Sequence, residues 1–328
     1  MATSTESKQM ITGKSFEYAL LQQFHEKLKN KTSVEIVRNS AFTIAKDCFE
    51  MVTEEERGEY VLSASFAVNF LMDLEPRLSN AVSEDDILQL EIVSDEKGKA
   101  GDVRDVLAIR SSQEWEVGVS AKNNHNAVKH SRLSDTNDFA EKWFGIQASQ
   151  QYWDAVRPIF ENLRAIQTES NKQSKWSDLE NKQSEVYVPI LNAFIKELGR
   201  LFATNRESVS ANLINHLVGV KDFYKVIKYK DTVEIHAYNI NGTLSLPFND
   251  IAPKYPVSII LLPTEIVSVE MKADSDTTAI VTLDNQWVLS FRIHNASSRI
   301  EPSLKFDITL IESPRNLFKN TLNIAYDK

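Results

Sequence analysis

The chain has very little cysteine and no long apolar run. Cys48 is the one cysteine among 328 residues, which argues against a disulfide framework or a cysteine-rich zinc site. No uninterrupted apolar run approaches the roughly 20 residues of a membrane-spanning helix. Residues 1–14 lack the apolar stretch of a secretory signal. We therefore expect a soluble cytoplasmic protein that has no membrane partner and keeps its cysteine reduced.

A surplus of positive charge is also absent. The formal net charge is −9, whereas a protein held on nucleic acid by phosphate attraction alone would be basic overall. The charge does not exclude an enzyme that recognises a DNA sequence, because clustered cations can make a local groove while acid elsewhere limits non-specific binding. The distribution of charge therefore matters more than its sum.

Linkers rich in Pro, Gly or Ser, internal repeats and low-complexity tracts are missing, so no domain boundary is marked sharply. Apolar residues recur at helical intervals at first and with a period of two from Phe223 onwards. The pattern predicts helices at 15–29, 33–53, 60–79, 138–166, 176–203 and 208–218, and later strands at 226–229, 233–238, 243–246, 257–262, 266–272, 278–283, 287–294 and 304–311. We place a soft boundary at 222, between residues 1–222, which begin with a helical layer, and a β-rich region of residues 223–328.

Three short strands are predicted at 87–93, 103–109 and 115–122, with acids at the start of the second and a lysine at the end of the third. Antiparallel pairing would bring Asp102 or Asp105 close to Lys122. Carboxylates bind a divalent ion that activates water and polarises a phosphate, and an ammonium group can neutralise developing charge without competing for the ion. The pattern is typical of a metal-dependent nuclease.

Each of these residues also has a simpler interpretation. Short acids such as Asp102 and Asp105 are common in turns and at strand starts, and Lys122 could be a solvated lysine at a strand end. Taken singly, these interpretations explain each residue. The combined pattern, with a basic block directly after it, favours a site.

The hairpin resembles the PD-(D/E)xK nuclease superfamily, in which an acid precedes an acid-any-lysine triplet. The triplet here is Ser120-Ala121-Lys122, so a serine stands where the second acid belongs. We expect Asp102 or Glu91 to replace that acid as a metal ligand beside Asp105. Other candidates are Glu116, which lies about 20 Å along the strand from Lys122, and two acids of the N-terminal helices, Glu50 and Asp73.

Three longer blocks, residues 101–106, 120–134 and 291–298, resemble the HaeIII type II restriction endonucleases. The resemblance implies a mixed α/β (α+β) fold, with a restriction-endonuclease-like mixed sheet core flanked by helices and a β-rich C-terminal region. It also implies Mg²⁺-dependent cutting of double-stranded DNA at GGCC and a cognate DNA methyltransferase as functional partner. A homodimer is a further possibility, because cutting both strands of a palindrome often involves two copies.

Two segments combine cations with amides and hydroxyls. Residues 117–134 contain no acid, and we expect Lys129, His130 and Arg132 to contact the DNA backbone. In residues 291–299 we expect Arg292, Asn295 and Arg299 to contact bases or flanking phosphates, since an arginine fork matches the two major-groove acceptors of guanine. The alternatives are a solvated loop for the first segment and a hairpin turn for the second.

The hypothesis is therefore an endonuclease in which Asp105 and a second acid hold Mg²⁺ while Lys122 assists the attacking water. Residues 1–222 would contain the PD-(D/E)xK-like catalytic core, and residues 223–328 would form the DNA-recognition region. Two other classes remain open. The missing acid at Ser120 would suit a sequence-specific DNA-binding protein without catalysis. A repair or structure-specific nuclease of the same fold would cut without a fixed sequence.

Overall fold

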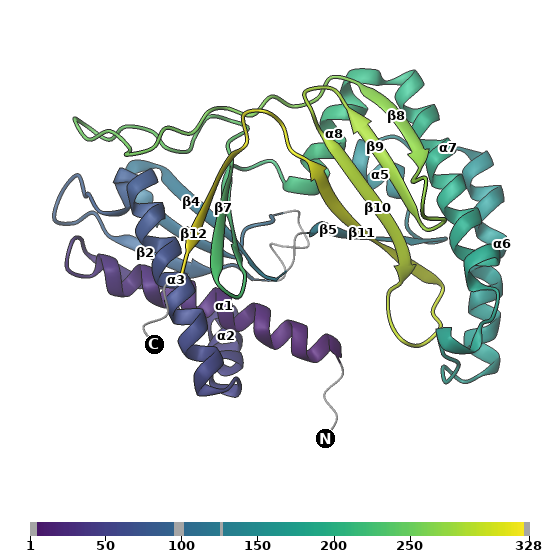
Figure 1. Ribbon diagram of the computed structural model, residues 1–328, viewed down its shortest axis with the longest axis horizontal. Coiled ribbons are helices and arrows are strands. Elements are labelled where there is room, and N and C mark those ends of the chain that lie inside the picture. The colour runs from purple at the N-terminus through teal and green to yellow at the C-terminus, as the bar shows by residue number, and fades with distance from the viewer. Residues whose placement is uncertain (1–4, 95–101, 125–126, 325–328) are drawn as a thin grey trace. The chain divides into compact units, whose positions relative to one another are not determined.

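The computed structural model describes residues 5–94, 102–124 and 127–324 (Figure 1). Clustering of its contacts gives two compact units. Unit 1 consists of residues 1–126, 219–260 and 316–328, and unit 2 of residues 127–218 and 261–315. Each unit has its own sheet and its own helices.

Unit 1 is built on a mixed sheet. Within the described residues it has seven strands in the order β1-β2-β3-β4-β6-β7-β12, with bounds β1 (Val34–Ile36), β2 (Leu88–Ile92), β3 (Val106–Arg110), β4 (Trp115–Asn123), β6 (Phe223–Lys228), β7 (Thr232–Tyr238) and β12 (Phe318–Asn323). The pairs β1–β2 and β4–β6 are parallel and the other pairs are antiparallel. The predicted antiparallel β2-β3-β4 arrangement is confirmed.

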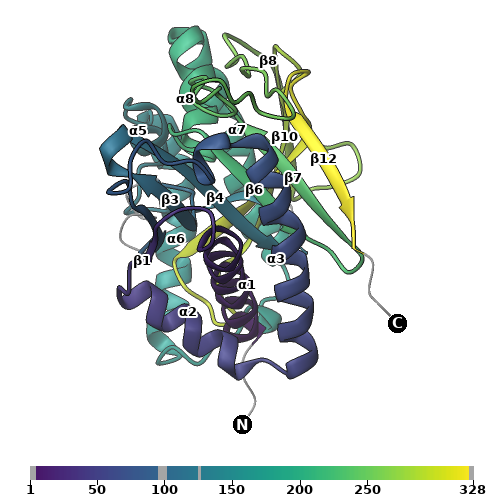
Figure 2. The same cartoon turned by 90° about the vertical axis from the view of Figure 1, so that its left-hand side faces the viewer.

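Three helices, α1 (Thr5–Leu28), α2 (Ser40–Met51) and α3 (Glu54–Leu74), form one core with this sheet (Figure 2). The apolar stripe of α1 is buried, as its helical spacing predicts. Thr53 and Glu56 form a capping box that starts α3. Alternate residues of β4, such as Val117 and Val119, enter the same core, so the residues between them face the other way.

Unit 2 is built on an antiparallel sheet in the order β5-β11-β10-β9-β8. Its strands are β5 (Ala127–Ser134), β8 (Ile266–Met271), β9 (Thr278–Leu283), β10 (Val288–Asn295) and β11 (Ser303–Glu312), and its helices are α5 (Phe139–Phe144), α6 (Gln150–Glu169), α7 (Val188–Thr204) and α8 (Arg206–Val218). Trp143 and Phe194 from the helices pack against Phe291 and Phe306 from the sheet. These four aromatic side chains therefore belong to the core of unit 2.

The remaining described elements are short helical segments at Pro76–Leu78, Ser111–Gln113, Trp176–Asp178 and Gln183–Tyr187. Among the described helices, none combines the length and the apolar character needed to cross a bilayer.

The expected mixed α/β class and the β-rich C-terminal region are confirmed, but the units do not follow a single division at 222. Strands β6, β7 and β12 complete the sheet of unit 1, because β6 pairs with β4 in parallel. The expected strands at 243–246 and 257–262 do not form. Pro256 and Pro263 flank the second of these segments, and proline cannot donate to a strand ladder.

Glu75, directly after α3, is a buried carboxyl group in the core of unit 1. Its Oε1 accepts hydrogen bonds from the Tyr224 hydroxyl and from the Ser245 backbone N–H, both at 2.7 Å. Burial raises its pKa from 4.5 to about 7, although these two bonds act in the opposite direction. The carboxyl group is therefore protonated more readily in the folded chain than in the unfolded chain.

Because the folded-state pKa is the higher one, the stability that Glu75 contributes is present below pH 4.5 and is lost as the pH rises through about 7. We expect the free energy of unfolding of the natural chain to fall by roughly 3 kcal/mol more than that of Glu75→Gln between pH 4.5 and pH 8. Urea unfolding across this range measures the difference. Parallel pH profiles for the two chains would contradict it.

Candidate active site and DNA-facing surface

Asp105 lies where three strands of unit 1 meet. It directly precedes β3, its backbone N–H donates to the carbonyl of Val119 on β4 at 2.8 Å, and its own carbonyl accepts from Val93 after β2 at 2.9 Å. These two bonds fix the backbone on both sides. The position of the side chain is therefore set by the sheet and not by a free loop.

The carboxylate of Asp105 and the end of β4 converge as the hairpin pattern predicts. Its Oδ2 accepts from the Ala121 backbone N–H at 2.7 Å, the Ser120 hydroxyl at 3.2 Å and the Lys122 ammonium at 3.3 Å. Ser120, at the expected position of the second acid, donates a hydrogen bond that orients Asp105. It supplies no negative charge.

A second carboxylate comes from α1. Glu17 is 7% exposed, and its pKa is raised from 4.5 to about 7, first by burial and then by the negative charge of Asp105. Lys14, whose Nζ lies 3.0 Å from Glu17 Oε2, and Lys122 oppose this shift. The carboxyl group of Glu17 is therefore near enough to Asp105 to be affected by its negative charge.

The sequence interpretation considered acids of the N-terminal helices but did not name Glu17. A signal was present, because Glu17 lies one helical turn before Leu21 and two before Phe24, within the apolar stripe of α1. A buried acid is rare unless it is paired or functional. Glu50 and Asp73, which were considered, form surface pairs with Lys46 and Lys254.

Asp102 is held by a neighbouring arginine instead of facing Asp105. Arg104, 4% exposed, donates to Asp102 Oδ1 at 2.8 Å and to Oδ2 at 2.7 Å, and also to Glu116 at 2.9 Å. Burial alone would raise the pKa of Asp102, but these bonds lower it. Gly118 makes room for this arginine, since a Cβ there would lie 2.1 Å from Arg104 Cδ. The fork occupies both oxygens, so Asp102 does not suit the expected metal role.

Glu91 lies on β2 opposite Leu107, two residues from Val93, the residue that bonds Asp105. That offset is about 7 Å along the strand. Within the ranges that the structure describes, no group of three or more His, Cys, Asp or Glu side chains is arranged to hold a metal ion. The metal role of Glu91 stays a prediction, and Glu17 is a further carboxyl group whose pKa is raised by the negative charge of Asp105.

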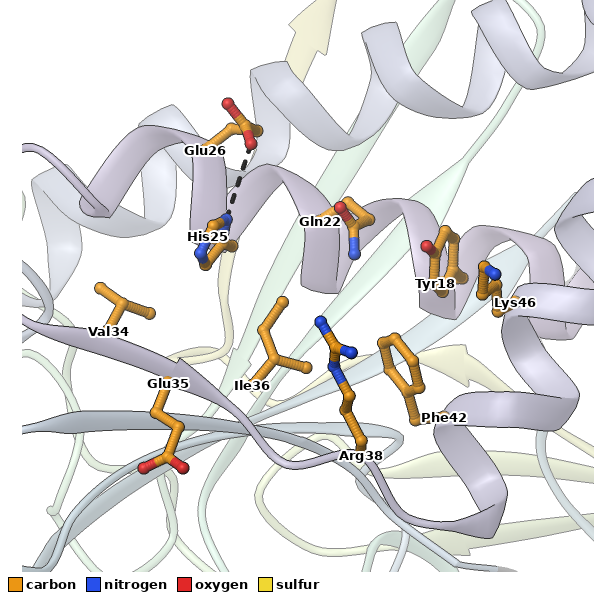
Figure 3. A pocket seen from close by; sticks show the side chains of 10 residues that line it. All are labelled: Tyr18, Gln22, His25, Glu26, Val34, Glu35, Ile36, Arg38, Phe42 and Lys46. Atoms are coloured by element: carbon orange, nitrogen blue, oxygen red, sulfur yellow. Dashed lines mark ion pairs between the residues drawn. The ribbon is translucent and has the colours of Figure 1, made fainter.

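A pocket lies along another side of α1. It is lined by side chains that include Tyr18, His25, Arg38 and Lys46 (Figure 3). Successive residues are about 100° apart around a helix, so Tyr18 and Glu17 project in different directions. The pocket is therefore separate from the carboxylate pair.

In unit 2, one face of the sheet carries charge and the other is apolar. Strand pairing aligns Arg292 with Asp307 and Asp307 with His130, and it aligns Arg132 with Lys305 in the next row. The intervening residues enter the aromatic core. Because paired residues share a face, His130 and Arg132 of β5 and Arg292 of β10 lie on one surface, defined here as the charged face.

Asp307 organises this charged face. Its carboxylate accepts from Arg292 at 2.8 Å and lies 2.7 Å from His130 Nδ1 and 3.4 Å from His294 Nε2. The side chains of Arg292 and His130 are nevertheless 59% and 46% exposed. Both therefore remain accessible to a ligand.

Lys129 does not lie on the charged face. It is adjacent to His130 on β5 and so points the other way, where its Nζ donates to the carbonyl of His216 at 2.5 Å. Burial lowers its pKa. The sequence analysis did not predict a strand in this segment. Because residues of β5 alternate between the two faces of the sheet, Lys129 does not suit the expected contact with the DNA backbone.

Asn295 and Arg299 follow Arg292 but are held by local bonds. The Asn295 side chain donates to the Ser297 carbonyl and accepts from the Tyr187 hydroxyl at 3.3 Å. Arg299 is exposed and donates to the carbonyl of Lys172 at 3.3 Å. Of the three residues predicted here, Arg292 has the placement that best suits a ligand on the charged face. His125, which belongs to the same basic block as His130, lies outside the described residues.

Comparison with known proteins assigns the chain to a class of DNA-cleaving enzymes. It belongs to the HaeIII restriction endonuclease family, whose model matches residues 13–314. The type II restriction enzyme HaeIII of Haemophilus aegyptius is 37% identical over 313 residues, which cover 95% of this chain and 96% of that relative. No solved structure matches the chain. The family resemblance noted in the sequence is confirmed.

Proposed function

We propose that the protein is a type II restriction endonuclease, a site-specific deoxyribonuclease that makes double-strand cuts in DNA at GGCC by metal-dependent phosphodiester hydrolysis. Family membership supports the class and the sequence specificity. The observation that carries the chemistry is the gathering of Asp105, Glu17 and Lys122 at the ends of β3 and β4.

The residues present suit Mg²⁺. This ion prefers oxygen ligands and is usually held by one or two carboxylates, with water and phosphate completing its shell. Asp105 and the buried Glu17 are two such carboxylates, and the negative charge of Asp105 contributes to the raised pKa of Glu17. A divalent ion held by both would relieve that repulsion. When bound, Mg²⁺ polarises the phosphate and lowers the pKa of bound water.

The chain's own residues then have distinct tasks. Asp105 and Glu17 hold the ion, and the Ser120 hydroxyl and the Ala121 N–H keep Asp105 in place. Lys122, with its ammonium 3.3 Å from Asp105, is positioned to orient the attacking water or to neutralise charge on the phosphate. This is a PD-(D/E)xK arrangement in which the second acid comes from a helix and not from the triplet.

DNA recognition falls to the charged face of unit 2. Arg292 is our candidate for reading guanine, and Arg132 and His130 for phosphate contacts. Asp307 holds Arg292 and His130 in register across two strands. It acts as a positioning residue, since it has no positive charge to offer a phosphate.

The test is digestion of a DNA of known sequence with Mg²⁺. We expect discrete fragments that end at GGCC, none when EDTA removes the metal, and none from a matched duplex in which GGCC is changed to GGAC. Retardation of the duplex without fragments would identify a non-catalytic DNA-binding protein. Cutting without fixed ends would identify a repair or structure-specific nuclease.

Three further expectations belong to this proposal. A homodimer would place one catalytic centre on each strand of a palindrome. A cognate DNA methyltransferase would protect the host sequence, and a shared cytoplasmic location would follow. Sedimentation with and without the GGCC duplex tests the first, and resistance of GGCC-methylated DNA tests the second.

A further inference from the structure

The pocket beside α1 is lined by side chains that have hydrogen-bond donors to spare. It has a volume of about 610 Å³ and lies between α1, β1 and the first turns of α2. The guanidinium of Arg38 and the amide of Gln22 point toward each other across it (Figure 3). In the part of the chain that the structure describes, neither side chain has a hydrogen bond or an ion pair. Their donors are therefore available to a ligand.

Tyr18 and Lys46 add two further donors at the same end of the pocket. The ring of Tyr18 packs on Phe42, with the ring centroids 5.7 Å apart, and its hydroxyl has no hydrogen bond to any residue that the structure describes. Burial raises the pKa of Tyr18, and the positive charges of Lys46 and Arg38 oppose that rise. Both cations are therefore near the Tyr18 hydroxyl.

Two acids that line the pocket are directed elsewhere. The carboxylates of Glu26 and Glu35 both point away from Arg38 (Figure 3). Glu35 lies between Val34 and Ile36, which pack against the core of unit 1, so alternation along β1 turns Glu35 to the other face of the sheet. These carboxylates therefore leave the donors of the pocket unoccupied.

Glu50 is a third acid near these cations. It pairs with Lys46 at 3.3 Å along the surface of α2, where the two side chains are 58% and 47% exposed. An exposed pair of this kind contributes little free energy, so Lys46 can turn to a ligand at small cost. Together with the unpaired Arg38, it gives the pocket a positive charge that favours an anion.

A nucleotide suits this pocket. An arginine fork and a lysine ammonium bind phosphate oxygens by charge-assisted hydrogen bonds, and the Tyr18 hydroxyl and the Gln22 amide can donate to the remaining oxygens. Val34, Ile36 and Phe42 provide an apolar wall beside these donors. The volume falls within the roughly 300–1,000 Å³ of sites for small organic ligands, which leaves room for a sugar or base next to the phosphate.

We propose that this pocket binds the phosphate group of a nucleotide, with the guanidinium of Arg38 as its main contact. Lys46, Tyr18 and Gln22 are the further donors. The nucleotide belongs either to the DNA strand or to a free nucleoside monophosphate, because both present the same phosphate oxygens. This inference goes beyond the proposed function, since it uses neither the metal-binding carboxylates nor Lys122.

The position of Arg38 favours a nucleotide of the DNA. Asn39, the next residue, caps α2 and donates to the carbonyl of Ile92 on β2 at 2.9 Å. Val93, which follows Ile92, donates to the carbonyl of Asp105. The pocket therefore lies at the same end of the sheet as Asp105, where the cleaved strand would pass.

Two binding measurements, both made in EDTA, test the proposal. Calorimetric titration with deoxyguanosine monophosphate should show affinity reduced by about tenfold or more in Arg38→Met, because a hydrogen bond to a charged group is lost. Lys46→Met should have a smaller effect, since Lys46 is shared with Glu50. If the phosphate belongs to DNA, the log–log salt dependence of binding to a GGCC duplex should become less negative by about 0.9 in Arg38→Met.

Lys31→Met is the matched control. Lys31 is an exposed cation between α1 and β1 that does not line the pocket, and its replacement should leave both measurements as in the natural chain. An altered salt dependence in Arg38→Met assigns the phosphate to DNA, and weakened binding of the monophosphate alone assigns it to a free nucleotide. The proposal is overturned if Arg38→Met matches the natural chain in both measurements, or if Lys31→Met changes them as much.

Digestion of GGCC DNA with Mg²⁺ separates this proposal from the proposed function. A chain that does not cut DNA but responds to Arg38→Met in either measurement has the nucleotide pocket without the nuclease activity. A chain that cuts at GGCC but shows no response to Arg38→Met has the nuclease activity without the pocket.

Discussion

Replacing Asp105 with asparagine is expected to remove DNA cleavage, with a loss of at least about 10³-fold at saturating Mg²⁺. Asparagine has the same size, and its oxygen can still accept from the Ala121 N–H. The substitution removes the negative charge that pairs with Lys122 and that we propose as a ligand of the ion. Single-turnover cleavage of a GGCC duplex measures the rate, and calorimetric titration with Mn²⁺ should show that metal binding disappears with it.

Asp102→Asn is the control for this substitution. Asp102 also precedes β3, but it is bonded to Arg104. We expect it to cut DNA at a rate within a few-fold of the natural chain while unfolding more easily, because a buried arginine loses its charged partner. A rate for Asp105→Asn within tenfold of the natural chain would disprove the assignment of Asp105.

Glu17→Gln is expected to raise the Mg²⁺ concentration needed for half-maximal cutting by about 10²-fold or more, since a ligating carboxylate contributes at least as much as the outer groups that typically change metal affinity 10- to 100-fold. DNA binding in EDTA should stay unchanged. The melting temperature should change little, because glutamine has the same size, its oxygen can still accept from Lys14, and the charge near Asp105 is removed. Cleavage as a function of Mg²⁺ and thermal unfolding without metal measure these two results.

Glu26→Gln provides the matched control, since Glu26 is on the same helix but is about half exposed and pairs with Lys29. It should leave the Mg²⁺ requirement unaltered. If Glu17→Gln has the same Mg²⁺ requirement as the natural chain, the second acid must come from elsewhere, and Glu91 becomes the next residue to test.

The difference between Asp102, Asp105 and Glu17 indicates what local sequence can establish. Spacing placed both aspartates at the start of one strand, and antiparallel pairing correctly brought Asp105 to Lys122. Spacing could not tell that Arg104 would fold back over Gly118 and hold Asp102. Glu17 is 88 residues before Asp105 in the chain, and only the packing of α1 against the sheet brings the two together.

The division of the chain has a similar origin. A change of period at Phe223 correctly indicated a β-rich region, yet period says nothing about which strand pairs with which. Because β6 pairs in parallel with β4, β6 and β7 belong to unit 1. Because β5 pairs with β11, most of the basic block, residues 127–134, belongs to unit 2. The strand in that block also separates Lys129 from His130 and Arg132 by turning them to opposite faces.

By itself, the sequence determined the family, the mixed α/β class, the antiparallel arrangement of β2, β3 and β4, and the contact between Asp105 and Lys122. These depend on residue identity and on contacts between near neighbours in the chain, which local periodicity encodes. Tertiary structure alone decided the partner of Asp102, the approach of Glu17 and the charged face of unit 2. Each of these requires segments far apart in sequence to pack together, and the free energy of that packing is a property of the whole fold.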